Sequence, residues 1–182
     1  MKTRRLFILV EGNDDERFFS RIIRPIVQDR YDSVEIIMYA CMKSVKVSRY
    51  VKSITEMGHD LILCADIDQE RNVRGKKAVL HQRFSPLADD SIIVIIREIE
   101  SWYLAGLDSR AQKKFGIRSF RTTSHITKEI FNGMIPRYYT SRIVFMGDIL
   151  AAYSLPVARE KNRSFSYFCG KYDIPADPDQ TA

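Results

Sequence analysis

The sequence has few of the features that mark disulfide-rich, zinc-binding or membrane-spanning proteins. Its 182 residues include three cysteines without a C-x-x-C spacing, namely Cys41, Cys64 and Cys169. An odd count in this pattern predicts neither a disulfide framework nor a zinc site. No apolar run approaches the roughly 18 residues that a membrane span needs. The apolar stretch after Arg5 is also too short for the core of a secretory signal. We therefore expect a cytoplasmic protein with no membrane partner.

Motifs for nucleotide binding and for metal ligation by histidine are also missing. The chain contains neither GxxxxGK[ST] nor GxGxxG, so a P-loop or a dinucleotide-binding fingerprint is not expected. The three histidines, His59, His81 and His125, have no metal-ligand spacing. Each of them is expected on the surface or in packing contacts.

The positive charge of the chain is concentrated in one stretch. The net charge is +6, but residues 1–108 hold 17 basic and 17 acidic residues, which is a balance of zero. Residues 109–147 hold 8 basic residues and one acid, a balance of +7, and residues 148–182 hold 4 and 5. A basic segment of this kind favours a polyanionic partner such as nucleic acid, although a solvated basic face has the same composition.

Buried strands alternate with helices in the first part of the chain. Continuous β-prone runs at residues 6–10, 34–39, 61–65 and 92–96 predict four strands, and the segment 45–57 predicts a helix between two of them. This alternation predicts parallel βαβ units in an open, mainly parallel α/β sheet of about four strands with flanking helices. Residues from about 98 onward are mainly helical in pattern. We predict an α/β domain at 1–108 and a basic helical extension at 109–182, either packed on it or part of one compact domain.

Acidic side chains follow three of the four predicted strands. Glu11 follows the first, Asp66 and Asp68 follow the third, and Glu98 and Glu100 follow the fourth. Ligands of open parallel sheets bind at the carboxyl ends of strands, near the switch in strand order. Two bare carboxylates about 4 Å apart repel by about 4 kcal/mol at an effective dielectric of about 20. Such a cluster must be protonated, paired with Lys or Arg, or bridged by a cation, and oxygen ligands favour Mg²⁺ or Mn²⁺.

Each acidic group also has a structural explanation. Gly12 allows a tight turn, and Asp15 complements the N-terminal dipole of the next helix. Asp66 and Asp68 are acceptable turn or cap residues, and the acids at 98 and 100 fit the first turn of a helix. The functional interpretation depends on the conjunction of an acid directly after the first strand with D-x-D directly after the third.

These residues resemble the two signature motifs of the Toprim domain. Glu11-Gly12-x-x-Asp15 and Asp66-x-Asp68 each follow a buried strand, and the resemblance covers residues 5–100. The segments 98–105 and 162–168 are similar to parts of small stand-alone Toprim-like proteins, which are related to the overcoming-lysogenisation-defect nucleases. This second similarity extends the resemblance over nearly the whole chain.

The resemblance implies a Toprim-like, Rossmann-like sheet that binds Mg²⁺ for phosphodiester chemistry. By this resemblance Glu11 is the general acid/base and a metal ligand, Asp66 and Asp68 are metal ligands, and Gly12 and Asp15 support the first motif. Two further acids, Glu100 and Glu98, are candidates for a second metal site as in two-metal nucleases. The chain has no counterpart of the separate tyrosine domain of topoisomerases, so hydrolysis is favoured over strand passage.

The leading hypothesis is a Mg²⁺- or Mn²⁺-dependent nuclease, with DNA or RNA left open as substrate. Candidate contacts to nucleic acid come from cations and one aromatic of the C-terminal half: Lys113, Lys114, Arg118, Arg121, Arg137, Tyr138, Arg142 and Arg163. One alternative, suggested by the family, is a non-enzymatic nucleic-acid-binding or regulatory subunit that partners an ATPase, for example in phage defence. A third is a small-molecule phosphatase, because the Asp66-x-Asp68 string also resembles the strand-end motif of haloacid-dehalogenase-like phosphatases.

Overall fold

The computed structural model describes residues 3–175, and these divide into two compact units. The first unit is Met1–Ile95 and the second is Ile96–Ala182. The division falls directly after the last strand, whereas the sequence predicted a boundary at residue 108. The helix that follows the last strand packs on later helices of the second unit, which accounts for the earlier boundary.

The first unit is built on an open sheet of four parallel strands. These are β1 (Arg5–Val10), β2 (Ser33–Met38), β3 (Asp60–Asp66) and β4 (Ile92–Ile95), and they lie in the order β2-β1-β3-β4. Every neighbouring pair is parallel. The predicted four-stranded parallel α/β architecture is therefore confirmed, and its layout is consistent with a Rossmann-like fold.

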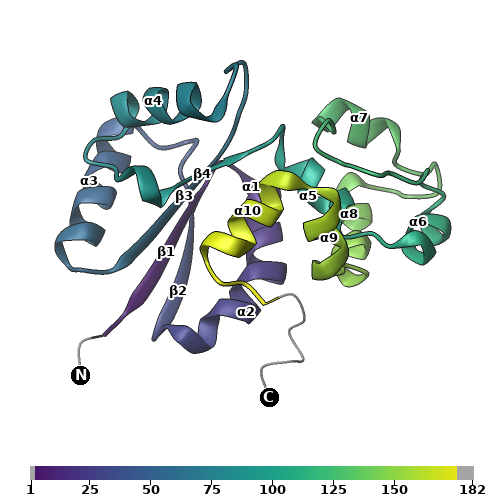
Figure 1. Cartoon of the computed structure of the whole chain (residues 1–182), viewed down its shortest axis with the longest axis horizontal. Helices are drawn as coiled ribbons and strands as arrows, with labels where there is room; N and C mark the ends of the chain where they lie inside the picture. The colour runs from purple at the N-terminus through teal and green to yellow at the C-terminus, as the bar shows by residue number, and fades with distance from the viewer. Residues whose placement is uncertain (1–2, 176–182) are drawn as a thin grey trace. The chain divides into compact units, whose positions relative to one another are not determined.

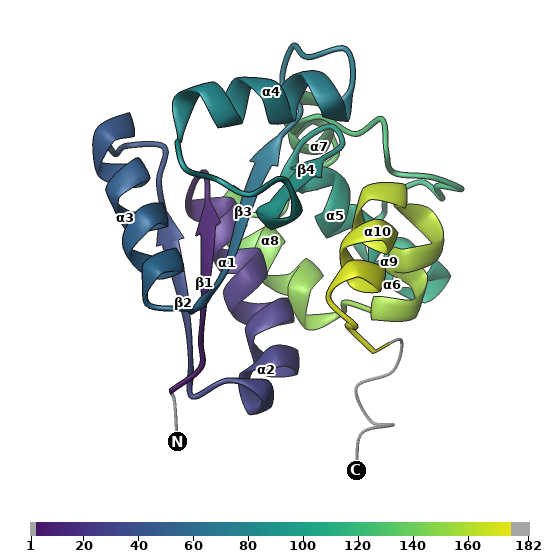
Figure 2. The same cartoon turned by 60° about the vertical axis from the view of Figure 1, so that its left-hand side comes forward.

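Helices cover both faces of this sheet (Figure 1). One face carries α1 (Asn13–Phe18) and α2 (Arg24–Val27), which are joined by a π-helical turn at Phe19–Ile23. The other face carries α3 (Ser44–Glu56) and α4 (Val73–Arg83), as the turned view in Figure 2 also shows. Right-handed crossovers produce this arrangement, because the chain moves one way from β1 to β2 and the opposite way for the later strands. Short 3₁₀ turns at Gln28–Arg30 and Asp89–Ser91 complete the unit.

The strands of the sheet differ in burial according to their position in it. All five residues from Leu6 to Val10 are buried in β1, and all four residues of β4 are buried. Edge strand β2 is only half-buried along most of its length. Continuous apolar runs are the expected composition of strands covered on both faces, which is why the sequence located β1, β3 and β4 clearly.

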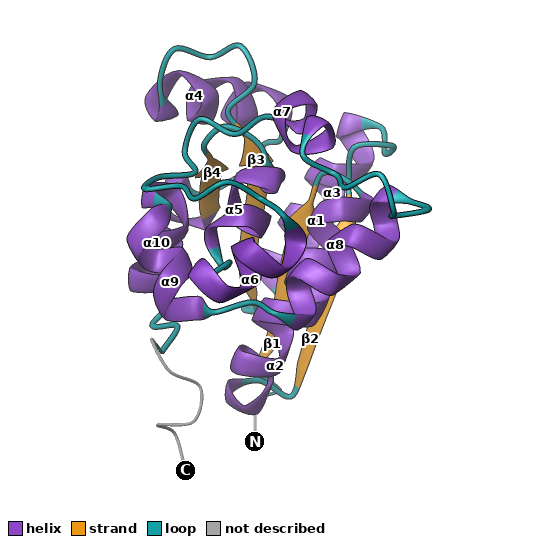
Figure 3. Cartoon of the chain, turned by 90° about the vertical axis from the view of Figure 1, so that its right-hand side faces the viewer, coloured by secondary structure: helices purple, strands orange, loops and turns teal. Residues whose placement is uncertain are grey.

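The second unit is helical, and residues 96–175 contain no strand (Figure 3). Its helices are α5 (Ile99–Ala105), α6 (Ser109–Phe115), α7 (Lys128–Gly133), α8 (Arg142–Ala151), α9 (Leu155–Lys161) and α10 (Arg163–Lys171). Gly116 ends α6 in the left-handed region with φ 65°, where glycine is favoured. Leu155 begins α9, and Pro156 lies in its first turn, where no amide hydrogen is needed.

A buried hydrogen-bond network centred on Asn162 joins distant segments of the second unit. The Asn162 amide donates to Ser101 Oγ and Thr123 Oγ1, both at 3.2 Å, and its carbonyl accepts from Ser164 Oγ at 2.8 Å. Ser164 Oγ also accepts the Trp102 indole N–H at 2.9 Å. Both Asn162 and Trp102 are fully buried. Trp102 is therefore a core residue of the second unit.

The helices show no candidate for a membrane span. Within residues 3–175, none is long and apolar enough to cross a bilayer.

Candidate active site

Two of the predicted acidic residues flank the switch point of the sheet. Strand β1 pairs with β2 on one side and with β3 on the other, so the strand order reverses between β1 and β3. Glu11 follows β1 directly, and Asp66 is the last residue of β3. This is the position where open α/β sheets bind ligands. The prediction that these strands deliver acids to one edge matches the topology of the first unit.

Glu11 lies in an environment that favours its protonated form. Its side chain is 29% exposed, and burial is the largest cause that raises its pKa above the usual value. The Lys76 ammonium opposes this effect and the Asp68 carboxylate reinforces it. A raised pKa brings a carboxyl group closer to the range in which a general acid or base works at neutral pH.

Tyr39 is a further residue of this site, and the sequence analysis did not single it out. It follows β2 and is 2% exposed. Its hydroxyl lies 3.2 Å from Glu11 Oε1 and 3.2 Å from the carbonyl oxygen of Cys64, and it can donate to either. Burial raises the pKa of Tyr39, so the hydroxyl keeps its proton. The structure thus gives Glu11 a fixed hydrogen-bond donor.

Lys76 is the second residue that the sequence analysis missed. It comes from the first turn of α4, is 6% exposed, and forms an ion pair with Asp68. Its Nζ atom also lies 4.0 Å from Glu11 Oε1. A buried lysine requires a partner, and here two carboxylates provide it. Clustered carboxylates can be protonated, paired with Lys or Arg, or bridged by a cation, and in this structure a lysine pairs with them.

Asp68 has an unusual backbone conformation. Its φ is 52°, in the left-handed region that non-glycine residues seldom occupy, although aspartate tolerates it better than most. The segment is anchored on its N-terminal side, since the Ile67 N–H donates to the Ile95 carbonyl at 3.0 Å. The Asp68 side chain is 59% exposed. The turn after β3 therefore presents this carboxylate to solvent and to Lys76 together.

Asp15 and Gly12 form a local motif at the start of α1. The buried Asp15 carboxylate accepts the Gly12 N–H at 3.2 Å, which fixes the turn between β1 and α1. Gly12 has φ −148°, an extended conformation open to any residue, and an added Cβ would meet nothing closer than 3.9 Å. The fold therefore does not require glycine at this position.

The charges of these acids also act on Cys64. Burial raises the pKa of the Cys64 thiol, and the charges of Asp15, Asp66 and Glu11 raise it further. The thiol stays protonated, so Cys64 has no nucleophilic role here.

The fit of a divalent cation to this edge can be judged from the donor set. Among residues 3–175, no three His, Cys, Asp or Glu side chains form a group arranged to hold a metal ion. The groups present are carboxylates, with Glu11 and Asp68 sharing the Lys76 ammonium. Mg²⁺ is commonly held by one or two carboxylates, with water and phosphate oxygens as the other ligands. Carboxylate oxygens suit Mg²⁺. Because few of them are present, water and phosphate oxygens would fill most of the coordination positions.

The acids at 98 and 100 have partners within the second unit. Glu100 is 3% exposed and pairs with Arg142 at 2.5 Å, and Arg142 also donates to Asn132. Glu98 accepts the backbone N–H of Lys128. These contacts assign Glu100 and Arg142 to the packing of the second unit, and we include neither in the candidate site.

The other predicted nucleic-acid contacts are surface residues of the second unit. Tyr138 is 68% exposed, and its ring lies 4.9 Å from that of Tyr139. In the described chain, none of the following exposed cations forms an ion pair with a carboxylate: Lys113, Lys114, Arg118, Arg121, Arg137 and Arg163. Their charge is available to a polyanion.

Comparison with known proteins gives no relative for this chain. No protein-family model, curated protein or solved structure matches it.

Proposed function

We propose that the chain is a Mg²⁺-dependent, Toprim-like hydrolase of nucleic-acid phosphodiesters. The observation that carries this proposal is the acidic edge at the switch point, where a carboxyl group with a raised pKa, Glu11, lies beside Asp68 and the buried Lys76. Proton transfer needs a group that can hold and release a proton near neutral pH. The neighbouring cation can stabilise charge that develops on a phosphoryl oxygen.

The side chains have distinct roles in this proposal. Glu11 moves the proton, and the Tyr39 hydroxyl orients it through the contact at 3.2 Å. Lys76 holds Asp68 at the turn after β3. One or two of the carboxylates of Glu11, Asp66 and Asp68 would hold Mg²⁺ together with water and phosphate oxygens, and the bound ion would polarise a phosphoryl oxygen and lower the pKa of a water molecule.

The test is cleavage of single- and double-stranded DNA and RNA in the presence of Mg²⁺ or Mn²⁺. We expect Glu11→Gln and Asp68→Asn to lower the rate at least about 100-fold, in the range reported for loss of a general acid/base. Asp29→Asn, which alters an exposed carboxylate in the turn after α2, serves as the matched control. Equal rates in all four proteins, or no cleavage with either metal, would overturn the proposal.

A second candidate is a nucleic-acid-binding or regulatory subunit without catalytic activity. It is favoured by one observation, namely that Lys76 pairs with Glu11 and Asp68 and so compensates these carboxylates without a metal ion. Salt-dependent binding that persists in EDTA and in an Asp66→Asn/Asp68→Asn variant, without cleavage, would select it. Turnover of a phosphomonoester alone would instead indicate a phosphatase.

A further inference from the structure

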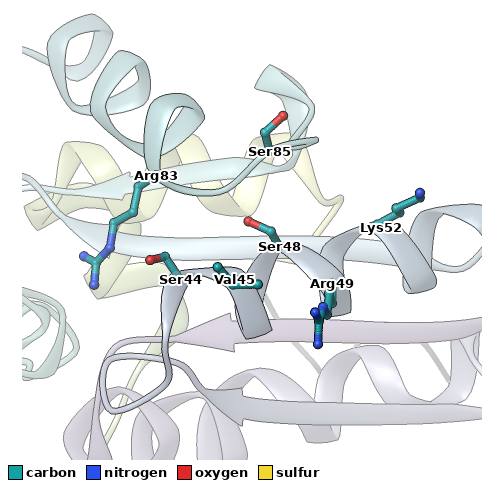
Figure 4. A pocket seen from close by; sticks show the side chains of 7 residues that line it. All are labelled: Ser44, Val45, Ser48, Arg49, Lys52, Arg83 and Ser85. Atoms are coloured by element: carbon teal, nitrogen blue, oxygen red, sulfur yellow. The ribbon is translucent and has the colours of Figure 1, made fainter.

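A basic groove lies on the first unit, on the face of the sheet that carries α3 and α4. It has a volume of about 300 Å³ and is formed by the N-terminal half of α3 and the end of α4. We call it the α3 groove, and its lining residues are Ser44, Val45, Ser48, Arg49, Lys52, Arg83 and Ser85 (Figure 4). Three cations and three hydroxyls thus line it, with no acidic side chain.

The cations of the α3 groove are not neutralised by neighbouring carboxylates. Arg49 and Arg83 form no ion pair with Asp or Glu in the described part of the chain, and the Arg83 guanidinium lies over the Phe84 ring at 4.9 Å. Lys52 meets Glu56 at 3.7 Å, but both side chains are more than 60% exposed. Exposed pairs of this kind contribute little. The groove therefore has an uncompensated positive charge.

Further exposed cations lie in the sequence around the α3 groove. Residues 43–55 contain four Lys or Arg and no Asp or Glu. Residues 71–88 contain five, but Lys76 is buried against Asp68 and Lys77 pairs with Asp89, so the positive charge of this segment comes from its three arginines. The zero balance of residues 1–108 conceals this segregation, because the acids gather in other segments of the unit. The exposed cations of α3 and of the end of α4 thus form a basic surface on the first unit.

The arrangement of the side chains suits successive phosphates better than a single ion. In Figure 4 the Arg83 side chain extends from the end of α4 toward Ser44, whereas Arg49 and Lys52 extend outward from α3. Ser44 and Ser48 are four residues apart and so share one face of the helix. Arg, Lys and Ser are the side chains that most often contact phosphate oxygens of nucleic acid. Val45 is the one apolar residue of the lining, and no aromatic residue of the lining could stack on a base.

We propose that the α3 groove binds the phosphate backbone of a nucleic acid, without reading its sequence. The class of ligand rests on the proposed function, but the groove itself needs neither metal nor hydrolysis. Each cation that contacts a phosphate displaces counterions, so binding weakens as salt rises. The α3 groove would hold a nucleic acid while the acidic edge of the same unit acts on it.

The test is fluorescence anisotropy with labelled single-stranded and duplex oligonucleotides in EDTA, which separates binding from metal-dependent cleavage. We compare the wild type with Arg49→Gln, Arg83→Gln and the matched control Arg21→Gln, an exposed arginine on the opposite face of the sheet. We expect each groove variant to lower the slope of log K against log salt by about one. At about 0.1 M salt this corresponds to a roughly eightfold loss of affinity. The control should bind like the wild type, and equal melting temperatures should show that all variants fold.

Several outcomes would overturn the proposal. These are no binding by the wild type, an equal loss in Arg21→Gln, or stronger binding to anionic phospholipid vesicles than to the oligonucleotides. The rate of cleavage of a small phosphodiester, bis(p-nitrophenyl) phosphate, distinguishes the two proposals. A groove variant should cleave it at the wild-type rate, whereas Glu11→Gln should not. If Glu11→Gln loses this cleavage while the groove variants bind oligonucleotides like the wild type, the groove proposal is wrong and the proposed function is kept.

Discussion

Replacement of Lys76 with methionine tests the electrostatic design of the acidic edge. The substitution keeps a long side chain in the buried position but removes the positive charge that Glu11 and Asp68 share. Both carboxylates then remain at the edge without compensation from this lysine. We expect the free energy of unfolding to fall at neutral pH and the loss to shrink in acid, where carboxylates are protonated.

The magnitude follows from the distance between Lys76 Nζ and Glu11 Oε1, which is 4.0 Å. This separation corresponds to about 4 kcal/mol at an effective dielectric of about 20 and about 1 kcal/mol in bulk water. The Glu11 side chain is 29% exposed, and removal of Lys76 also removes the cost of burying its charge. The contact with Asp68 adds little, because that side chain is 59% exposed and exposed ion pairs contribute little to stability. We therefore expect a loss of about 1 to 3 kcal/mol.

The assay is urea denaturation of wild type and Lys76→Met at about pH 7.5 and about pH 3, which lie above and below the pKa values of most carboxyl groups in folded proteins. A double-mutant cycle with Glu11→Gln should give a coupling energy of at least about 1 kcal/mol. An equal loss of stability at both pH values, with no coupling, would show that Lys76 acts through packing alone. The electrostatic account of the site would then be wrong.

Three further predictions concern single residues. Burial raises the pKa of Glu11 in the folded protein above its value in the unfolded chain. Protonation of Glu11 therefore stabilises the fold at pH values below the unfolded pKa, and this stabilisation is lost as pH rises through the raised folded-state pKa. Glu11→Gln should therefore melt no lower than the wild type near pH 7, and a lower melting temperature there would contradict the pKa shift. Gly12→Ala should keep the wild-type melting temperature, since the backbone is extended, while lowering cleavage if a phosphate approaches this turn. A lowered melting temperature would contradict the steric argument. Asn162→Leu should lower the free energy of unfolding by about 3 to 5 kcal/mol, because its buried partners lose their bonds. Arg163→Gln, at an exposed neighbour, should change it by less than about 0.5 kcal/mol.

The sheet could be predicted from the sequence because its strands are continuous apolar runs. The run from Leu6 to Val10 has one explanation, a strand covered on both faces, and its buried position confirms it. The carboxylates at the ends of β1 and β3 followed from the same pattern, since parallel strands end at one edge. Local composition was sufficient for both conclusions.

The partners of the acidic residues could not be predicted, because they depend on contacts between distant segments. Lys76 belongs to a segment with many cations, so its sequence resembles a solvated helix face, although the side chain is 6% exposed. Tyr39 follows the strand that carries no acid, and only the order of the strands brings it to Glu11. Glu100 and Arg142 are 42 residues apart. Clustered carboxylates require a compensating cation, so the sequence could predict that some lysine or arginine lies beside them. It could not show that this residue is Lys76.

The Asn162 network determines which segments of the second unit tolerate substitution. Its members lie in the segments 98–105 and 162–168 and near Thr123, and each bond of Asn162 depends on another member being present. A chain that lost the acids of the sheet edge would still need all of them to fold its helical unit. The folding of the second unit therefore constrains these segments, independently of the chemistry proposed for the ends of β1 and β3.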